Sequence, residues 1–184
     1  MSHPQPPKPA QPVLSILSSR WDLFWPGLLQ DLSKRLGRPD FISERFDFTE
    51  TSYYDRELGT PIKRRILGFE QLVHPEELPG MKLFTNELEA RNLDQAGNRL
   101  FNLDPGLLQL ERLVLATGKE FAQRIYLRSG IWAEVTLIYQ KGGWRALPWT
   151  YPDYAGTLVQ DILTRIRDRF KDKLKSALPP ANLT

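Results

Sequence analysis

The sequence predicts one α+β domain with a mostly antiparallel sheet. It has a ferredoxin-like βαββαβ start, extended by a β-meander and a closing C-terminal helix. Three observations support this fold class. The composition, with 41% hydrophobic and 26% charged residues, is that of an ordinary globular protein. Apolar residues recur at helical spacing in three separate segments. In other segments they alternate with polar residues at strand spacing, and glycines and prolines separate these segments.

The length of 184 residues suits a single domain. Proline dominates the start of the chain, at Pro4, Pro6, Pro7, Pro9 and Pro12. Because proline lacks an N–H and favours extended backbone, such a segment is typical of a disordered or polyproline-like tail. We therefore expect a disordered Pro-rich tail over residues 1–12, one α+β domain over 13–178 and a C-terminal tail over 179–184.

The first helix has the clearest helical pattern. Pro26 suits the first turn of a helix, and Gly37 stands where a C-terminal cap is expected. A short buried strand over residues 13–18 precedes it. The apolar residues of the helix form one stripe: Trp21, Phe24, Trp25, Leu28, Leu29, Leu32 and Leu36.

Two strands are expected next, over residues 41–49 and 62–73. A short amphipathic helix then begins near Met81, and its polar face carries Lys82, Asn86 and Glu89. A strand over 99–103 follows. We expect the sequence Asp104-Pro105-Gly106 to end it in a turn, since proline pre-sets φ and glycine accepts positive φ. These first six elements match a ferredoxin-like arrangement.

A meander is expected in the second half of the chain, with strands over 113–117, 123–128, 131–139 and 144–149. Strict alternation in the third strand places Ile131, Val135 and Leu137 in the core and Glu134 on the opposite face. A long helix from Leu158 should close the domain and cover one sheet face. A closed, barrel-like sheet is the alternative arrangement.

Several classes of site are excluded. The chain has no cysteine, which removes disulfides, thiolate zinc sites and cysteine nucleophiles. The two histidines, His3 and His74, are far apart, so a histidine-rich metal centre is excluded too. Neither a G-x-x-x-x-G-K-[ST] loop nor a G-x-G-x-x-G motif is present. A Mg²⁺ site made of carboxylates remains compatible with the composition.

Net charge and hydropathy narrow the partners and the location. A net charge of +3 is only mildly basic, and nucleic-acid binders usually concentrate their charge more, so nucleic acid is disfavoured as a partner. No apolar run approaches the ~20 residues that span a bilayer, and the start lacks the apolar segment of a signal peptide. We expect a cytoplasmic protein without a membrane partner. No pattern specifies an oligomeric state.

Polar side chains gather at strand ends and turns. Asn102 and Asp104 are two residues apart, so both leave their strand on the same side. Glu134 leaves its strand opposite the main apolar face, and Lys119 and Arg124 are the cations best placed to balance these carboxylates. We expect them to meet in one cleft. The candidate catalytic residues are Asp104 and Glu134, and the candidate ligand-binding residues are Tyr54, Glu57, Asn102, Lys119, Arg124 and Asp153.

The same regions carry a family resemblance. The motifs are TSYYDRELG over residues 51–59, NLDPG over 102–106 and WTYPDY over 149–154. They resemble the motifs of a bacterial family, domain of unknown function 4416, and the likeness runs from the first strand to the last helix. Leu58 stands where that family would have methionine. The resemblance adds weight to the candidate residues and implies no particular reaction.

Two functions are compatible with these residues. The first is a small ligand-binding or catalytic domain acting on a phosphorylated or nucleotide-like anion, in which Arg124 contacts an oxyanion and Asp104 or Glu134 serves as base. Mg²⁺ could take part in such a site. The second is a non-catalytic module that holds protein or RNA through the aromatic turn and the basic closing helix. One concave pocket would favour the first, and a flat basic or aromatic surface the second.

Overall fold

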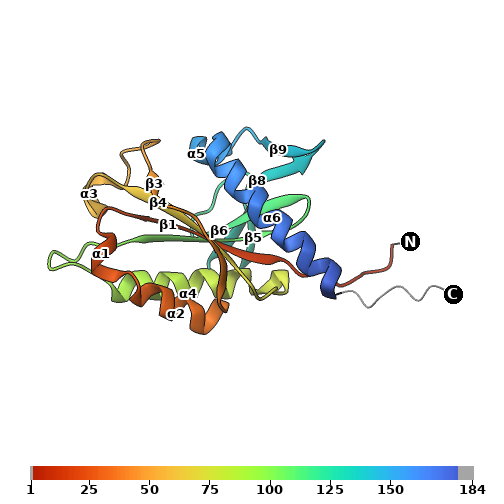
Figure 1. The fold of residues 1–184 in the computed structure, drawn as a ribbon, viewed down its shortest axis with the longest axis horizontal. Helices are drawn as coiled ribbons and strands as arrows, with labels where there is room; N and C mark the ends of the chain where they lie inside the picture. The colour runs from red at the N-terminus through yellow and green to blue at the C-terminus, as the bar shows by residue number, and fades with distance from the viewer. Residues whose placement is uncertain (1, 178–184) are drawn as a thin grey trace.

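The computed structural model describes residues 2–177, in which nine strands form one antiparallel sheet between two layers of helices (Figure 1). This confirms the predicted α+β class. The strand order is β2-β4-β1-β5-β6-β8-β7, with β3 joined to β4 and β9 joined to β8. The strands are β1 (Gln11–Ser18), β2 (Pro39–Ile42), β3 (Phe46–Asp47), β4 (Lys63–Phe69), β5 (Asn102–Leu108), β6 (Arg112–Thr117), β7 (Ile125–Arg128), β8 (Ile131–Gln140) and β9 (Gly143–Ala146). The helices are α1 (Trp21–Phe24), α2 (Gly27–Leu36), α3 (Asp55–Leu58), η1 (Pro75–Glu77), α4 (Leu78–Arg91), α5 (Pro152–Ala155) and α6 (Thr157–Ala177).

The start of the chain has the expected ferredoxin-like strand order. β1 lies between β4 and β5 and is antiparallel to both, and β2 completes the order β2-β4-β1-β5. The single strand expected over 41–49 is wrong, because β2 and β3 pair separately with β4. Between them the Ser43 hydroxyl accepts the N–H of Ile66, which interrupts the backbone ladder. The sheet is open, with β2 and β7 at its edges, so the barrel alternative is also wrong.

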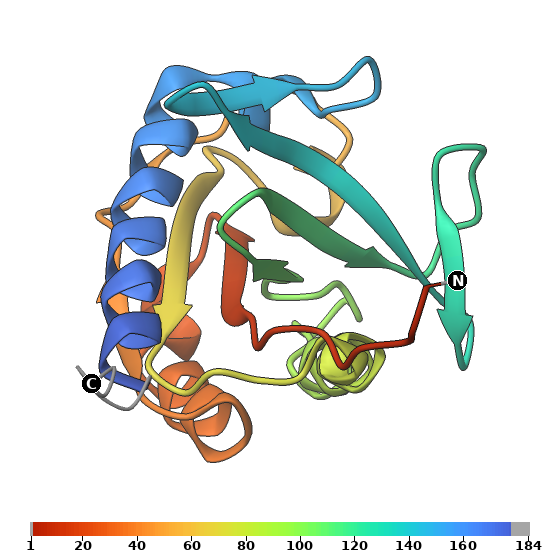
Figure 2. The same cartoon turned by 90° about the vertical axis from the view of Figure 1, so that its right-hand side faces the viewer.

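Helices α1, α2 and α4 cover one face of the sheet. The predicted apolar stripe is buried there, with Leu28, Leu32 and Leu36 of α2 packed beside Met81 and Leu88 of α4. Pro26 separates α1 from α2 and stands at the N-cap, so the regular helix begins at Gly27. Figure 2 views α4 nearly end on, beneath the strands that it covers.

Helix α6 covers the opposite face, as expected. Its residues Ile162, Leu163, Ile166 and Phe170 pack in one cluster with strand residues that include Leu108. No helix within residues 2–177 combines the length and the apolar character needed to cross a membrane. The expected C-terminal tail over 179–184 lies outside the described residues.

The N-terminal boundary differs from the expected one. Residues 2–9 are exposed, but Ala10 is fully buried and exchanges both backbone hydrogen bonds with Val73. β1 begins at Gln11, so residues 10–12 belong to the sheet and not to the tail. The run of prolines predicted the end of the tail too far along the chain, because Pro12 is tolerated within β1.

The meander consists of antiparallel strands, but their spatial order is not their sequence order. β6 pairs with β8, and the β7 hairpin lies outside β8 at the sheet edge. Ile131 and Leu137 are buried as predicted, while Val135 is only half-buried. The register between β6 and β8 shifts between Leu113 and Val114, and such a bulge moves later side chains to the other face of the sheet. Strict alternation therefore failed at Val135.

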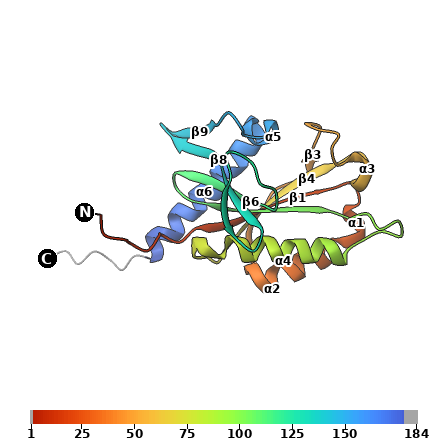
Figure 3. The same ribbon diagram turned by 180° about the vertical axis from the view of Figure 1, so that it is seen from behind.

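The two halves of the sheet separate along β5. β5 pairs with β1 over its whole length, but it pairs with β6 only from Gly106 to Leu108. Viewed from behind, β1 and β4 extend toward one end of the molecule, and β8 and β9 lie toward the other (Figure 3). The predicted turn at Asp104-Pro105-Gly106 is thus wrong, since these residues lie inside β5. They stand at the point where β6 departs.

Candidate functional site

Pro105 and Gly106 determine where the sheet opens. The backbone N–H and C=O of Leu103 point away from β1. Because the direction of these groups alternates from residue to residue along a strand, the backbone nitrogen and C=O of Pro105 also point away from β1, toward β6. Proline has no N–H to donate there, and the ladder with β6 ends at the next residue, Gly106. A Cβ on Gly106 would lie 2.7 Å from both the Leu115 side chain and the Val114 carbonyl oxygen. The NLDPG sequence therefore leaves a gap between β5 and β6 up to Pro105, and the two strands pack closely from Gly106 onward.

Helix α4 closes the exposed edge of β5 within this gap. Lys82 Nζ donates to the Leu103 carbonyl at 2.7 Å, and Glu89 accepts the Leu103 N–H at 2.5 Å. Both side chains are buried, although the sequence could not distinguish their face from an exposed one. They replace the hydrogen bonds that a continued β6 would have made. Polar groups from the helix layer thus enter the space between the strands.

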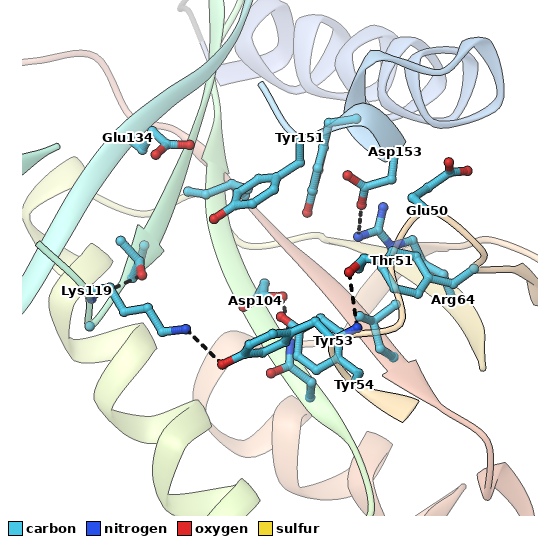
Figure 4. A pocket seen from close by; sticks show the side chains of 18 of the residues that line it. Glu50, Thr51, Tyr53, Tyr54, Arg64, Asp104, Lys119, Glu134, Tyr151 and Asp153 are labelled. Atoms are coloured by element: carbon cyan, nitrogen blue, oxygen red, sulfur yellow. Dashed lines mark hydrogen bonds and ion pairs between the residues drawn. The ribbon is translucent and has the colours of Figure 1, made fainter. Parts of the chain in front are cut away.

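A cavity of about 710 Å³ occupies the opening between β5 and β6. Its size falls within the range of small-molecule sites, roughly 300–1,000 Å³. Figure 4 shows Asp104 near its middle, with Lys119 and Glu134 on one side and Arg64 and Asp153 on the other. Aromatic rings line it as well: Phe48, Tyr53, Tyr54, Tyr151 and Tyr154.

The floor of the cavity holds a network centred on Arg99. Arg99 binds Glu57 through two hydrogen bonds of 2.6 and 2.7 Å, and it donates to Glu89 at 2.8 Å. These bonds lower the pKa of Glu57 below its usual range, whereas burial raises the pKa of Glu89. The Arg99 nitrogen that donates to Glu89, Nη1, also donates to the amide oxygen of Asn102 at 3.0 Å, and the amide nitrogen of Asn102 donates to Asp104 at 2.7 Å.

Tyr54 lies beside this network with its hydroxyl protonated. Burial raises its pKa strongly, and the negative charge of Asp104 raises it further. The ring packs against Phe48 and edge-on against Tyr53. Tyr54 therefore contributes a neutral donor and an aromatic wall to the cavity.

The mouth of the cavity is formed by the turn between β6 and β7. Glu134, nearly fully buried, accepts from Arg124 at 2.9 Å and from Gln123 at 3.0 Å. The same guanidinium donates to the Lys119 carbonyl and, at 3.0 Å, to the hydroxyl of Tyr151. Glu134 thus holds Arg124 in place and leaves one edge of the guanidinium turned toward Tyr151.

Lys119 has no carboxylate partner among the described residues. Its ammonium lies 4.9 Å from the centre of the Tyr53 ring and donates to the Tyr53 hydroxyl at 3.1 Å. Tyr53 comes from the loop after β3, so this contact joins two loops across the mouth (Figure 4). Both mouth cations therefore bind tyrosine hydroxyls, which are weak acceptors compared with an oxyanion.

Arg64 was missed by sequence reasoning. It is only 2% exposed, lies between the rings of Phe48 and Tyr154 and pairs with Asp153. A charged residue in a strand usually points to solvent, and its partner lies far along the chain. Only its position in β4 indicated burial: Arg64 lies two residues before the buried Ile66, and alternate residues of a strand face the same side.

The structure brings most of the predicted residues together. Lining the cavity are Tyr54, Asn102, Asp104, Lys119, Arg124, Glu134 and Asp153. Glu57 does not line it and instead holds Arg99, which does. Sequence reasoning also missed Arg99, because it stands before β5 in an isolated bridge with Leu93 and not at the start of the strand expected over 99–103.

The side chains of the site do not form a set of metal ligands. Among residues 2–177, no three histidine or carboxylate side chains are grouped so that they could hold a metal ion. The carboxylates of the cavity are each directed at a different cation or amide, with Asp104, Glu89 and Glu134 bound by separate partners. The Mg²⁺ considered from the composition therefore has no ready set of ligands here.

Comparisons with known proteins identify the family. No curated protein and no solved structure matched the chain. A family model, described as a domain of unknown function (DUF4416), matches residues 8–170. This range contains β1, the cavity residues and most of α6. The chain therefore belongs to the family defined by that domain of unknown function.

Proposed function

We propose that the cavity binds a small anionic ligand, phosphorylated or nucleotide-like, with its anionic group between Lys119 and Arg124. The observation that carries this proposal is the set of partners that these two cations have. Lys119 lacks a carboxylate partner within the described residues, and the free edge of Arg124 contacts only a tyrosine hydroxyl. An oxyanion accepts hydrogen bonds from such groups far better than a phenol does.

The walls of the cavity suit an organic group attached to that anion. Tyr53 and Tyr151 are both exposed and stand on either side of the mouth (Figure 4). Aromatic faces of this kind hold flat or apolar ligand groups by stacking. The volume of about 710 Å³ leaves room for a ligand larger than a bare anion. Asp104 and Glu134 stay our candidates for a base, should the ligand be turned over.

The alternative function, a module that holds protein or RNA, has less support. It relied on the aromatic turn over residues 149–154 and on the basic closing helix. In α6, Arg167 stacks on Tyr139 and donates to the Leu110 carbonyl, and Lys173 pairs with Asp40. These two cations are used within the chain, and Tyr151 of the aromatic turn lines the cavity, so we favour the cavity as the functional site.

A thermal-shift screen tests the proposal. Inorganic phosphate, alkyl phosphates and nucleoside monophosphates should raise the melting temperature, because a ligand of the native state stabilises it. Lys119→Met should reduce this rise, and Lys171→Met, an exposed cation on α6, should leave it unchanged. If no anion of the panel shifts the melting temperature, or if both variants respond like the parent, the proposal is wrong.

A further inference from the structure

The charges around the cavity are separated along its length. At the mouth, Lys119 and Arg124 face one carboxylate, Glu134, which leaves an excess of positive charge. At the floor, two cations, Lys82 and Arg99, stand among three carboxylates: Glu57, Glu89 and Asp104. The floor therefore carries an excess of negative charge. On the third side Arg64 pairs with Asp153, and the exposed carboxylate of Glu50 lines the cavity beside them (Figure 4).

Asp104 is the floor carboxylate with the least compensation. Glu57 and Glu89 each accept a bond of 2.8 Å or shorter from Arg99. The nearest cation to Asp104 is Lys82, at 3.5 Å, and that ammonium is committed to the Leu103 carbonyl at 2.7 Å. The other oxygen of Asp104 accepts only the neutral amide of Asn102. Its carboxylate keeps unused acceptor capacity, and it is 30% exposed.

The surroundings of Asp104 turn this capacity toward the cavity. Figure 4 places the carboxylate at the centre, between Lys119 and Arg64. Asn86, from α4, lines the same floor, and its amide makes no side-chain hydrogen bond within residues 2–177. An ammonium or another N–H donor entering from the mouth would meet both groups. Its charge would balance the floor as the anion balances the mouth.

We propose that the ligand is zwitterionic, a phosphorylated amine whose N–H donors bind Asp104 while its phosphate group binds Lys119 and Arg124. This inference rests on the proposed function and adds the chemistry of the second end of the ligand. Complementary charge at both ends also gives selectivity, because a plain anion leaves Asp104 without a new partner and a plain amine meets repulsion at the mouth.

Matched probes test this inference by calorimetry. ω-Aminoalkyl phosphates of increasing chain length are compared with alkyl phosphates that carry a methyl group in place of the ammonium. The titrations are run at about pH 8, because burial raises the pKa of Glu89. We expect one chain length at which the amine binds at least about tenfold more tightly, the ratio given by one charge-assisted hydrogen bond.

Asp104→Asn keeps the shape and removes the charge. It should reduce that preference to about twofold or less by weakening the binding of the amine; Asp161→Asn, a change at an exposed carboxylate on α6, should leave the preference unchanged. Equal binding of amine and alkyl probes by the parent protein at every chain length would overturn the inference and leave the proposed anion site standing. Binding of neither series would end the proposed function, and with it the inference. The preference of the parent protein for the amine over the alkyl phosphate is measured without any variant. The inference can therefore be tested even if Asp104→Asn folds poorly.

Discussion

Gly106→Ala tests the strand crossing that creates the cavity. The added Cβ would lie 2.7 Å from Leu115 Cδ2 and 2.7 Å from the Val114 carbonyl oxygen. The side chain can rotate, but the carbonyl belongs to the Leu107–Val114 pair of the ladder and cannot withdraw without breaking it. Overpacking of a core costs about 1–3 kcal/mol, and we expect the upper end here. For a domain of this size that corresponds to a fall in melting temperature of roughly 6–12 °C.

The assay is urea or thermal unfolding of the parent protein, Gly106→Ala and one control. Gly27→Ala is the control, because a Cβ at Gly27 meets nothing within 4 Å and the residue begins α2. We expect it to be neutral or to stabilise by up to about 1 kcal/mol. If Gly106→Ala unfolds within about 1 kcal/mol of the parent protein, the close crossing of β5 and β6 is not required, and our account of the opening is refuted.

Two further predictions concern the tail and the floor. Deleting residues 2–8 should leave the melting temperature within about 1 °C of the parent value, whereas deletion through Pro12 should lower it by several degrees, because it removes buried Ala10 and the start of β1; equal effects would contradict this boundary. Glu57→Gln should destabilise by about 1 kcal/mol at neutral pH. The Arg99 bonds depress the pKa of Glu57, so its contribution is present above the ordinary glutamate pKa and is lost as pH falls through the lower folded value. Urea unfolding of the variant and the parent from neutral to acidic pH should therefore converge, and a difference that grows toward low pH would show the sign to be wrong; Glu87→Gln is the exposed control.

The sequence predicted those parts of the fold that follow from local periodicity. The apolar stripe of α1 and α2 and the positions of the meander strands need no knowledge of distant partners, and the ferredoxin-like order followed from the succession of elements. Pro105 shows where this reasoning ends. Pro-Gly usually marks a turn, but here the proline lies in a strand because its missing N–H is placed where β6 departs. Whether Pro105 lies in a turn or inside a strand depends on the position of β6, which the local sequence does not give.

The candidate site was predicted in part for the same reason. Asn102, Asp104 and Glu134 were found because strand alternation gives each side chain a direction. Arg64 was missed because its burial depends on Phe48, Tyr154 and a carboxylate from α5, none of which is near it in sequence. The bulge in β8 was equally invisible, since a register shift leaves no fixed mark on the residue pattern.

The most direct measurement compares the affinity of one alkyl phosphate for Lys119→Met and Tyr53→Phe with its affinity for the parent protein. Loss of the ammonium should weaken binding about tenfold or more. Tyr53→Phe keeps the ring but removes the hydroxyl that accepts a hydrogen bond from Lys119, so it should strengthen binding of the alkyl phosphate by about two- to fivefold. Opposite changes in the two variants are the result that we predict. Parallel losses, or no change in either, would contradict an anion site at this mouth.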